Sequence, residues 1–398
     1  MNNNKVINLS TFFCLYLARA IPATFLMTAL QVTMRQHHIG LATIGLLSLT
    51  RLPWSLKFIW TPLIDRHCVT VGDFKKLLIS TEVVFALAII IVGLLDVSNN
   101  LMLIIALVLL STFCASIQNV TNDTLAVNAF HRGDHSAVTS MKSMGRYVGR
   151  MLGGGFFIII LHQYGWHIVV PLLGFLAILL VLPIILDKHI VIADRRKSKN
   201  PAGIKDLYRF FTRRDALPQI IFLMLFFIGF DGIMSMFKPW MVDMGYNMKE
   251  IGLYNGVIGT SVAFVMAAFA GWWVKRAGLK TAQRIVSVFA ITVPAYFLFL
   301  TYVTPTLTLI MIGIVLMRAT EASAAVTVYS TSMDYVRSGR EGTDFTIQVV
   351  LVHISGSIIT IIAGGIGQWL DYRGLCIIEL ALSLISVWYV FFKFNNRE

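Results

Sequence analysis

Long apolar runs separated by short polar turns follow one another along the whole chain. The first run extends from Leu9 to Met34, and later runs are centred near residues 52, 86, 114, 150, 176, 228, 262, 291, 319, 356 and 382. An α-helix needs about 20 apolar residues to cross a hydrocarbon layer about 30 Å thick. The runs lack the alternation of polar and apolar side chains that marks the strands of a membrane barrel. The pattern therefore predicts an all-α membrane protein with twelve transmembrane helices.

Lysine and arginine are distributed unevenly among the turns. Most of the bases outside the spans fall in every second polar segment, and this set includes the N-terminus, the long middle loop and the C-terminus. The intervening turns carry only Arg35, Lys249 and Arg373. Because cytoplasmic loops are the ones enriched in lysine and arginine, we expect both termini to lie in the cytoplasm.

The longest polar stretch, residues 188–215, divides the chain into two similar halves. It contains nine bases and is interpreted as a linker that touches anionic lipid head groups, with a regulatory or docking role as the alternative. Residues 36–49, after the first span, resemble residues 245–258, after the seventh, and both contain an Ile-Gly-Leu triplet. Repeats of six helices related about the membrane normal are typical of secondary transporters whose solute lies between the halves. We therefore predict two pseudo-symmetric six-helix bundles, residues 1–187 and 216–398.

The composition leaves little room for other classes of protein. Hydrophobic residues make up 57% of the chain and charged residues 13%, whereas soluble proteins have roughly 45–50% and 25%. The net charge of +13 is explained by topology, because nucleic-acid binding needs a basic face on a polar domain. The four cysteines, scattered without metal-ligand spacing, are interpreted as apolar fillers, and the turn HRGDH (131–135) as solvated. We expect no cofactor, no nucleic-acid partner and a monomer in the lipid bilayer.

Charged residues also fall within the predicted spans. A charge in mid-span costs about 2.5–3.5 kcal/mol even on a lenient scale, so such residues usually face a cavity, a partner or a functional path. Buried carboxylates either pair with a base or bind a proton, and the sequence leaves open which acid does which. The excess of bases favours an anionic solute, unless structural ion pairs absorb it. The bases are Arg19, Arg51, Lys57, Lys142, Arg146, Arg150, Lys238 and Arg318, and the acids are Glu82, Asp123, Asp231 and Glu321.

The fifth predicted span carries two interleaved patterns. Lys142, Arg146 and Arg150 recur every four residues on one helical face. Gly145, Gly149 and Gly153 recur with the same spacing about 100° round the helix, which allows a neighbouring helix to approach closely. We predict that the glycines pack against a helix while the two arginines contact the anionic group of a solute.

Four segments of the chain resemble one known family. Residues 42–66, ATIGLLSLTRLPWSLKFIWTPLIDR, closely resemble the second-span signature of AmpG-like permeases of the major facilitator superfamily. Residues 117–127, 229–246 and 333–348 resemble that family's motifs in the fourth span, in the seventh span and before the eleventh. Within the family, the chain looks most similar to siderophore importers of the RhtX/FptX type, and the muropeptide permeases are more distant. The resemblance implies the major facilitator fold.

Several individual residues match the family motifs. They are Lys57, Asp65, Arg66, Gln118, Asp123, Asp231, Asp243, Asp344 and Gln348. The sequence departs from the pattern at Asn119, where the family has an acid, and at Arg146-Tyr147, where arginine and aromatic residue are exchanged. The turn with Asp65 and Arg66 resembles the one with which major facilitators latch cytoplasmic helix ends. We therefore assign gating to Asp65, Arg66, Asp344 and Gln348.

Taken together, these features predict a secondary transporter of the bacterial inner membrane. We expect it to import a small anionic solute such as a siderophore by proton symport and alternating access, with a muropeptide as the alternative solute. Arg19, Lys57, Gln118, Arg146, Arg150 and Arg318 are predicted to bind solute. Asp123, Asp231, Glu82 and Glu321 are predicted to couple protons or form ion pairs. A polytopic membrane enzyme and a non-transporting sensor are the less favoured classes, and no phosphate-binding GxxxxGK[ST] loop for ATP is present.

Overall fold

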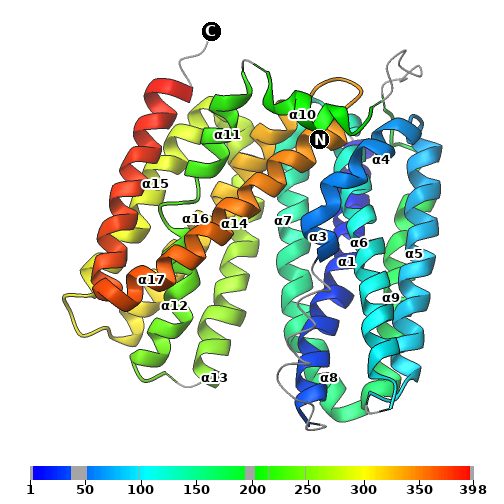
Figure 1. Cartoon of the computed structure of the whole chain (residues 1–398), viewed down its shortest axis with the longest axis horizontal. Coiled ribbons are helices and arrows are strands. Elements are labelled where there is room, and N and C mark those ends of the chain that lie inside the picture. Colours follow the sequence, from blue (N-terminus) through cyan, green and yellow to red (C-terminus); the bar gives the residue numbers. More distant parts are fainter. Residues whose placement is uncertain are drawn as a thin grey trace. The chain divides into compact units, whose positions relative to one another are not determined.

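The computed structural model describes residues 3–36, 52–97, 99–192, 202–213, 215–246 and 248–394. Regular secondary structure in these ranges is helical, as the hydrophobic pattern predicts (Figure 1). Nine of the described helical segments are long and apolar enough to cross a membrane. The chain forms two compact units.

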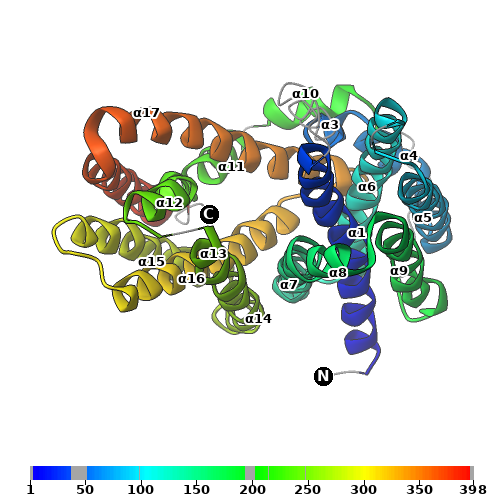
Figure 2. The same cartoon turned by 90° about the horizontal axis from the view of Figure 1, so that it is seen from below.

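The first unit comprises residues 1–131, 144–207 and 336–346. Its long helices pack around an apolar core to which Phe25, Phe85, Ile104 and Leu173 contribute, and α5 contacts both α6 and α9 (Figure 2). Thr70 and Asp73 form a capping box that starts α5. The helices of this unit are α1 (Asn3–Gln36), α3 (Leu52–Leu56), η2 (Lys57–Ile59), α4 (Thr61–His67), α5 (Val71–Leu94), α6 (Leu101–Ala129), α8 (Phe157–Tyr164) and α9 (Trp166–Leu186).

The glycines of the fifth span pack against α1, as predicted. They lie on α7 (His135–Met151) and on the π-helical turn η4 (Leu152–Phe156) that follows it. A Cβ atom added to Gly145 would lie 2.9 Å from the Cβ of Tyr16, and Cβ atoms at Gly149 and Gly153 would overlap α1. Small residues therefore let the two helices approach closely.

The second unit comprises residues 132–143, 208–335 and 347–398. Helices α14 and α15 pack on α16, and Phe222, Phe237, Phe297 and Ile314 belong to one apolar core. The helices that follow α9 along the chain are α10 (Lys205–Phe211), α11 (Ala216–Leu225), α12 (Asp231–Asp243), α13 (Met248–Ile251), η5 (Gly252–Ile258), α14 (Gly259–Ala277), α15 (Leu279–Leu300), α16 (Leu307–Asp334), α17 (Glu341–Tyr389) and η6 (Val390–Phe394). The first residues of α10 and of α17 belong to the first unit.

Four predicted spans are less regular than the hydrophobic pattern indicates. The span near residue 228 is divided into α11 and α12, and the described part of the span near residue 52 consists of α3, η2 and α4. The last two spans form one helical run, α17 with η6, which turns at Asp371 in the left-handed region (φ 55°). Residues 42–51 of the family signature, with Arg51, lie outside the described residues.

Candidate functional site

Buried polar side chains in the first unit gather around Asp123 on α6. The Tyr16 hydroxyl of α1 donates to Asp123 Oδ1 (3.1 Å), and the Asn119 amide donates to Oδ2 (3.3 Å). Lys57 Nζ donates in turn to Asn119 Oδ1 (3.3 Å). Lys57 is only 3% exposed, so its ammonium is held inside the unit and does not reach water by snorkelling.

Arg19 extends this arrangement along α1. Its guanidinium stacks over the Trp54 ring, with 4.7 Å between the Cζ atom and the ring centroid. Glu82 on α5 accepts a hydrogen bond from the Gln118 amide (2.8 Å) and attracts Arg19 electrostatically. Within the described part of the chain, Arg19 Nε has no hydrogen-bond partner. The first polar group is Tyr16, Arg19, Trp54, Lys57, Glu82, Gln118, Asn119, Asp123 and Arg146.

The two arginines of the fifth span have different surroundings. Arg146 is half-buried and lies over the Tyr147 ring, at 5.2 Å from its centroid. Its positive charge is close enough to Arg19 for the two guanidinium groups to repel each other. Arg150, one turn further along α7, is exposed. Arg146 and Arg19 therefore present two neighbouring guanidinium groups from different helices, an arrangement suited to a carboxylate.

Acidic side chains dominate the corresponding region of the second unit. Arg318 on α16 donates to Glu321 Oε2 and to Asn255 Oδ1, each at 2.8 Å. Asp231, at the start of α12, is half-buried and is repelled electrostatically by Glu321. Glu379 on α17 is 2% exposed, and its Oε2 accepts a hydrogen bond from the Ile233 backbone N–H (3.0 Å). The second polar group is Asp231, Asn255, Arg318, Glu321 and Glu379.

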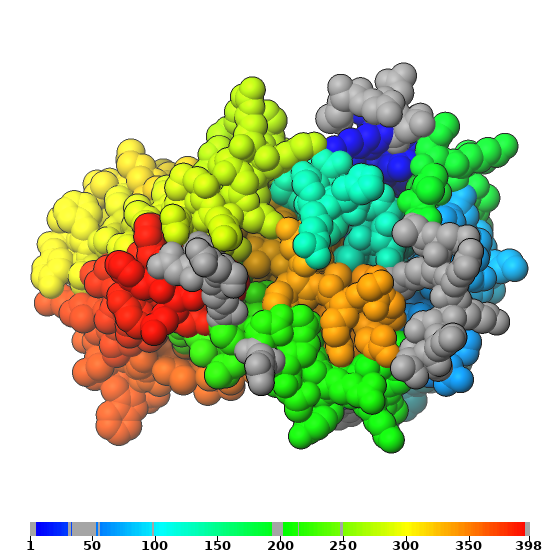
Figure 3. Space-filling view, turned by 90° about the horizontal axis from the view of Figure 1, so that it is seen from above, coloured from blue at the N-terminus to red at the C-terminus, as the bar shows by residue number. Residues whose placement is uncertain are grey.

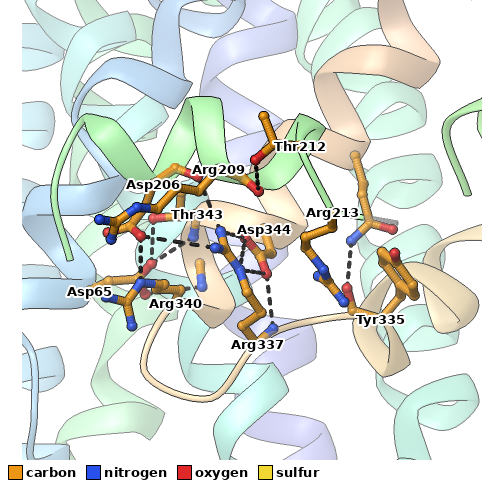
Figure 4. Close-up of polar contacts among 12 residues, drawn as sticks. Asp65, Asp206, Arg209, Thr212, Arg213, Tyr335, Arg337, Arg340, Thr343 and Asp344 are labelled. Atoms are coloured by element: carbon orange, nitrogen blue, oxygen red, sulfur yellow. Dashed lines mark hydrogen bonds and ion pairs between the residues drawn. The ribbon is translucent and has the colours of Figure 1, made fainter. Parts of the chain in front are cut away.

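Asp65 caps the beginning of α17. Its carboxylate accepts hydrogen bonds from the backbone N–H groups of Gly342 (3.0 Å) and Thr343 (2.7 Å) and from the Thr343 hydroxyl (2.6 Å) (Figure 4). A carboxylate at a helix N-terminus satisfies unpaired donors and interacts favourably with the helix dipole. Arg66, the next residue, is exposed.

A second set of ion pairs holds the same helix end. Arg337 forms a two-pronged pair with Asp344, with its shortest contact at 2.6 Å, and Arg340 contacts Asp206 at 2.7 Å (Figure 4). Figure 3 shows the green segment around α10 beside the orange segment that leads into α17. Burial disfavours the Asp206 carboxylate, but Arg340, the Gly203 N–H and Arg337 outweigh this effect and lower the pKa of Asp206.

Gln348 occupies a structural position within the second unit. Its amide nitrogen donates to the backbone carbonyls of Ser332 (3.0 Å) and Tyr335 (3.3 Å), and its oxygen accepts from the Gln219 amide (2.7 Å). These bonds join the end of α16 to α17 and α11.

Asp243 is the last residue of α12. It accepts a hydrogen bond from Tyr372, whose ring stacks on Trp240.

The interpretation of HRGDH as a solvated turn is wrong for its last residue, His135. His135 is 3% exposed, and its Nδ1 lies 2.5 Å from Asp334 Oδ1. Asp134 pairs with Lys275 at 2.5 Å. These partners lie 199 and 141 residues away in the sequence, and nothing within the turn itself indicates them.

Comparison with known proteins identifies the family. A model of the Major Facilitator Superfamily matches residues 9–360. The chain belongs to the Major Facilitator Superfamily. As a member, it is a multi-pass membrane transporter, and the predicted major facilitator fold is confirmed.

Its curated relatives include AmpG-type permeases, which confirms the resemblance seen in the motifs. The chain is 25% identical to the anhydromuropeptide permease of Escherichia coli K12 over 272 residues, which are 67% of this chain and 55% of the permease. It thus spans only about half the length of that relative. It is 20% identical to AmpG 4 of Rickettsia conorii over 395 residues, covering 96% and 95% of the two chains.

Solved major facilitator structures show the same fold. A bacterial homologue of the iron transporter ferroportin, in an outward-facing state, has a TM-score of 0.73 at 15% identity, covering 98% of this chain and all of that one. The Escherichia coli fucose:proton symporter has a TM-score of 0.72 at 13% identity and covers 99% of both chains. At such identities the likeness concerns the fold alone.

Proposed function

We propose that this major facilitator imports an anionic anhydro-muropeptide across the bacterial inner membrane together with protons, with both termini in the cytoplasm. The observation that carries the proposal is the neighbouring pair of guanidinium groups, Arg19 over Trp54 and Arg146 over Tyr147. Two guanidinium groups bind a peptide carboxylate through parallel hydrogen bonds, and the tryptophan ring offers a stacking surface for a sugar. The name of the Escherichia coli relative supports the choice of solute.

The remaining predicted residues take supporting roles in this proposal. Lys57, Gln118 and Arg318 hold the polar groups together through the hydrogen bonds described above. Asp65 governs the conformational switch, because its carboxylate holds the start of α17. A siderophore, which also carries anionic oxygen donors, is the competing solute.

The test measures binding and uptake of one labelled solute by the purified protein. Proteoliposomes receive tritiated anhydro-muropeptide under a pH gradient, and the recovered label is checked for chemical change. Replacing Arg146 by lysine keeps the charge but loses the two-pronged geometry, so we expect affinity to fall by about tenfold. Arg19→Lys should act in the same direction and also weaken the stack on Trp54.

The matched control is Arg132→Lys, a change at an exposed base in the turn before α7. Its affinity should equal that of the wild type. Unchanged dissociation constants for both Arg19→Lys and Arg146→Lys would contradict the assignment of the arginines. Uptake of a ferric siderophore without uptake of the muropeptide would replace the solute, and recovery of chemically altered label would favour an enzyme.

A further inference from the structure

Glu379 is a buried acid that neither the family motifs nor the predicted site includes. It lies on the part of α17 that follows the turn at Asp371. Its Oε2 accepts a hydrogen bond from the N–H of Ile233, in the first turn of α12, and the neighbouring Gly232 N–H also favours the carboxylate. Glu379 Oε1 has no hydrogen-bond partner among the described residues although the side chain is 98% buried. An unpaired buried carboxylate oxygen is costly, so this atom calls for a function.

The acid lies at a break in the seventh span, between α11 and α12. Backbone groups released at such a break need partners, because lipid supplies none. Helix α17 provides them: the Ser355 hydroxyl donates to the Met224 carbonyl (2.8 Å), and the Ser383 hydroxyl donates to the Gly229 carbonyl (3.0 Å). On the α12 side of the break, Glu379 Oε2 accepts the hydrogen bond from the Ile233 N–H. This one oxygen is sufficient for the structural role of Glu379.

The fit between the acid and the break is tight. Gly232 has no side chain, and a Cβ atom there would overlap Glu379 Oε1. A Cβ atom on Gly229 would likewise overlap the Ser383 hydroxyl. The Glu379 carboxyl therefore lies directly on the first turn of α12, out of reach of bulk water.

The charges around Glu379 are mostly negative. Asp231 faces it from α12 and repels it, and Glu321 on α16 repels Asp231 in turn. Arg318 is engaged by Glu321 and Asn255, and Cys376 is the titratable neighbour on α17 itself. The N-terminus of α12 contributes about half a positive charge, which stabilises one carboxylate but not two.

We propose that Glu379 and Asp231 together bind the transported proton, with Glu379 Oε1 as the atom that carries it. The proton comes from water on one side of the membrane, forms an O–H bond at Oε1, and is released to water on the other side. Protonation removes the repulsion toward Asp231, while Oε2 continues to accept the Ile233 N–H. The break thus stays capped in both states. The inference rests on the proton coupling in the proposed function.

Infrared difference spectroscopy tests protonation without any solute. In lipid nanodiscs, a pH titration of the wild type should show a protonated-carboxyl band that shifts when glutamate is labelled with ¹³C at its side-chain carboxyl. Glu379→Gln should lose this band, and Asp231→Asn should change the pH at which it disappears, because the two groups titrate as a pair. The matched control Asp371→Asn, at an exposed acid on α17, should keep the band unchanged.

A band that persists in Glu379→Gln, or that does not shift with labelled glutamate, overturns the proposal. If the glutamine variant fails to fold, Glu379→Asp serves instead: the band should remain but lose its sensitivity to labelled glutamate, and full retained sensitivity would contradict the assignment.

Transport provides the second readout. With tritiated anhydro-muropeptide in proteoliposomes, one proton per solute allows about tenfold accumulation per unit of pH gradient. Glu379→Gln should lose this accumulation but keep exchange of solute at equal pH, and Asp371→Asn should keep both. Full accumulation in Glu379→Gln would refute the inference. Failure of the wild type to take up the probe would count against the proposed solute alone, since the infrared result does not depend on it.

Discussion

The two polar groups hold opposite balances of charge in similar apolar surroundings. In the first, three bases (Arg19, Lys57 and Arg146) face two acids (Glu82 and Asp123). In the second, one base (Arg318) faces three acids (Asp231, Glu321 and Glu379). Buried ions of like sign repel strongly, so the two groups favour ligands of opposite charge. In the function proposed above, an anionic solute would neutralise the bases of the first group and a proton would neutralise an acid of the second.

The difference extends to the individual acids. Asp123 accepts hydrogen bonds from Tyr16 and Asn119, and Glu82 accepts one from Gln118 and attracts Arg19. Each of these acids therefore has hydrogen-bond donors, and Glu82 also has a base, among its neighbours. Glu379 instead has another acid, Asp231, as its charged neighbour. A buried acid therefore indicates proton binding only when its neighbours are known.

The largest effect should come from filling the space beside Glu379. In Gly232→Ala, the new methyl group would occupy the position of Oε1 and lie 2.9 Å from the Ala363 Cβ. Overpacking of this kind costs about 1–3 kcal/mol, and it also displaces the carboxyl. We expect pH-driven uptake of the muropeptide probe in proteoliposomes to be abolished.

Gly252→Ala is the matched control, because a Cβ atom at Gly252 has no neighbour within 4 Å. That variant should transport normally. Wild-type accumulation in Gly232→Ala would show that the contact between Gly232 and Glu379 is not needed for proton-coupled transport. The difference in charge between the two polar groups would then not explain how transport depends on pH.

The sequence predicted the helices and many of these residues, but not their partners. Apolar runs set the spans, and glycine spacing on the fifth span predicted its packing against another helix. Glu379 escaped notice because a single acid in the run CIIELALSL does not interrupt the hydrophobic pattern. Its role depends on the Ile233 backbone 146 residues earlier. Likewise, the stack of Arg19 on Trp54 and the pairing of His135 with Asp334 arise only from tertiary contacts.

Substitution of Asp123 in the first polar group and of Asp231 in the second should each have an intermediate effect on uptake, and the two effects should differ in kind. Asp123→Asn keeps an acceptor for the Tyr16 hydroxyl but places an amide against Asn119, which costs about 1–3 kcal/mol of folding free energy. We expect uptake to fall while its dependence on pH stays that of the wild type. Asp231→Asn should change that pH dependence instead. Initial rates measured across a pH series distinguish the two, and an altered pH profile in Asp123→Asn would contradict the comparison.

The smallest effect should come from the ion pairs at the start of α17. If the second polar group accounts for the pH dependence of transport, these ion pairs must not titrate in the same pH range. Because the folded-state pKa of Asp206 is lowered, its stabilising contribution is complete above the ordinary carboxyl pKa and is lost only as the pH falls through the lowered value. Asp206→Asn should therefore destabilise the protein by about 1–3 kcal/mol, equally at pH 5 and pH 7, through loss of its charged partnership with Arg340. Thermal unfolding followed by intrinsic fluorescence at both pH values measures the difference. A destabilisation at pH 7 that vanishes at pH 5 would mean that Asp206 titrates within the working range, and part of any pH dependence of transport would then belong to this helix end.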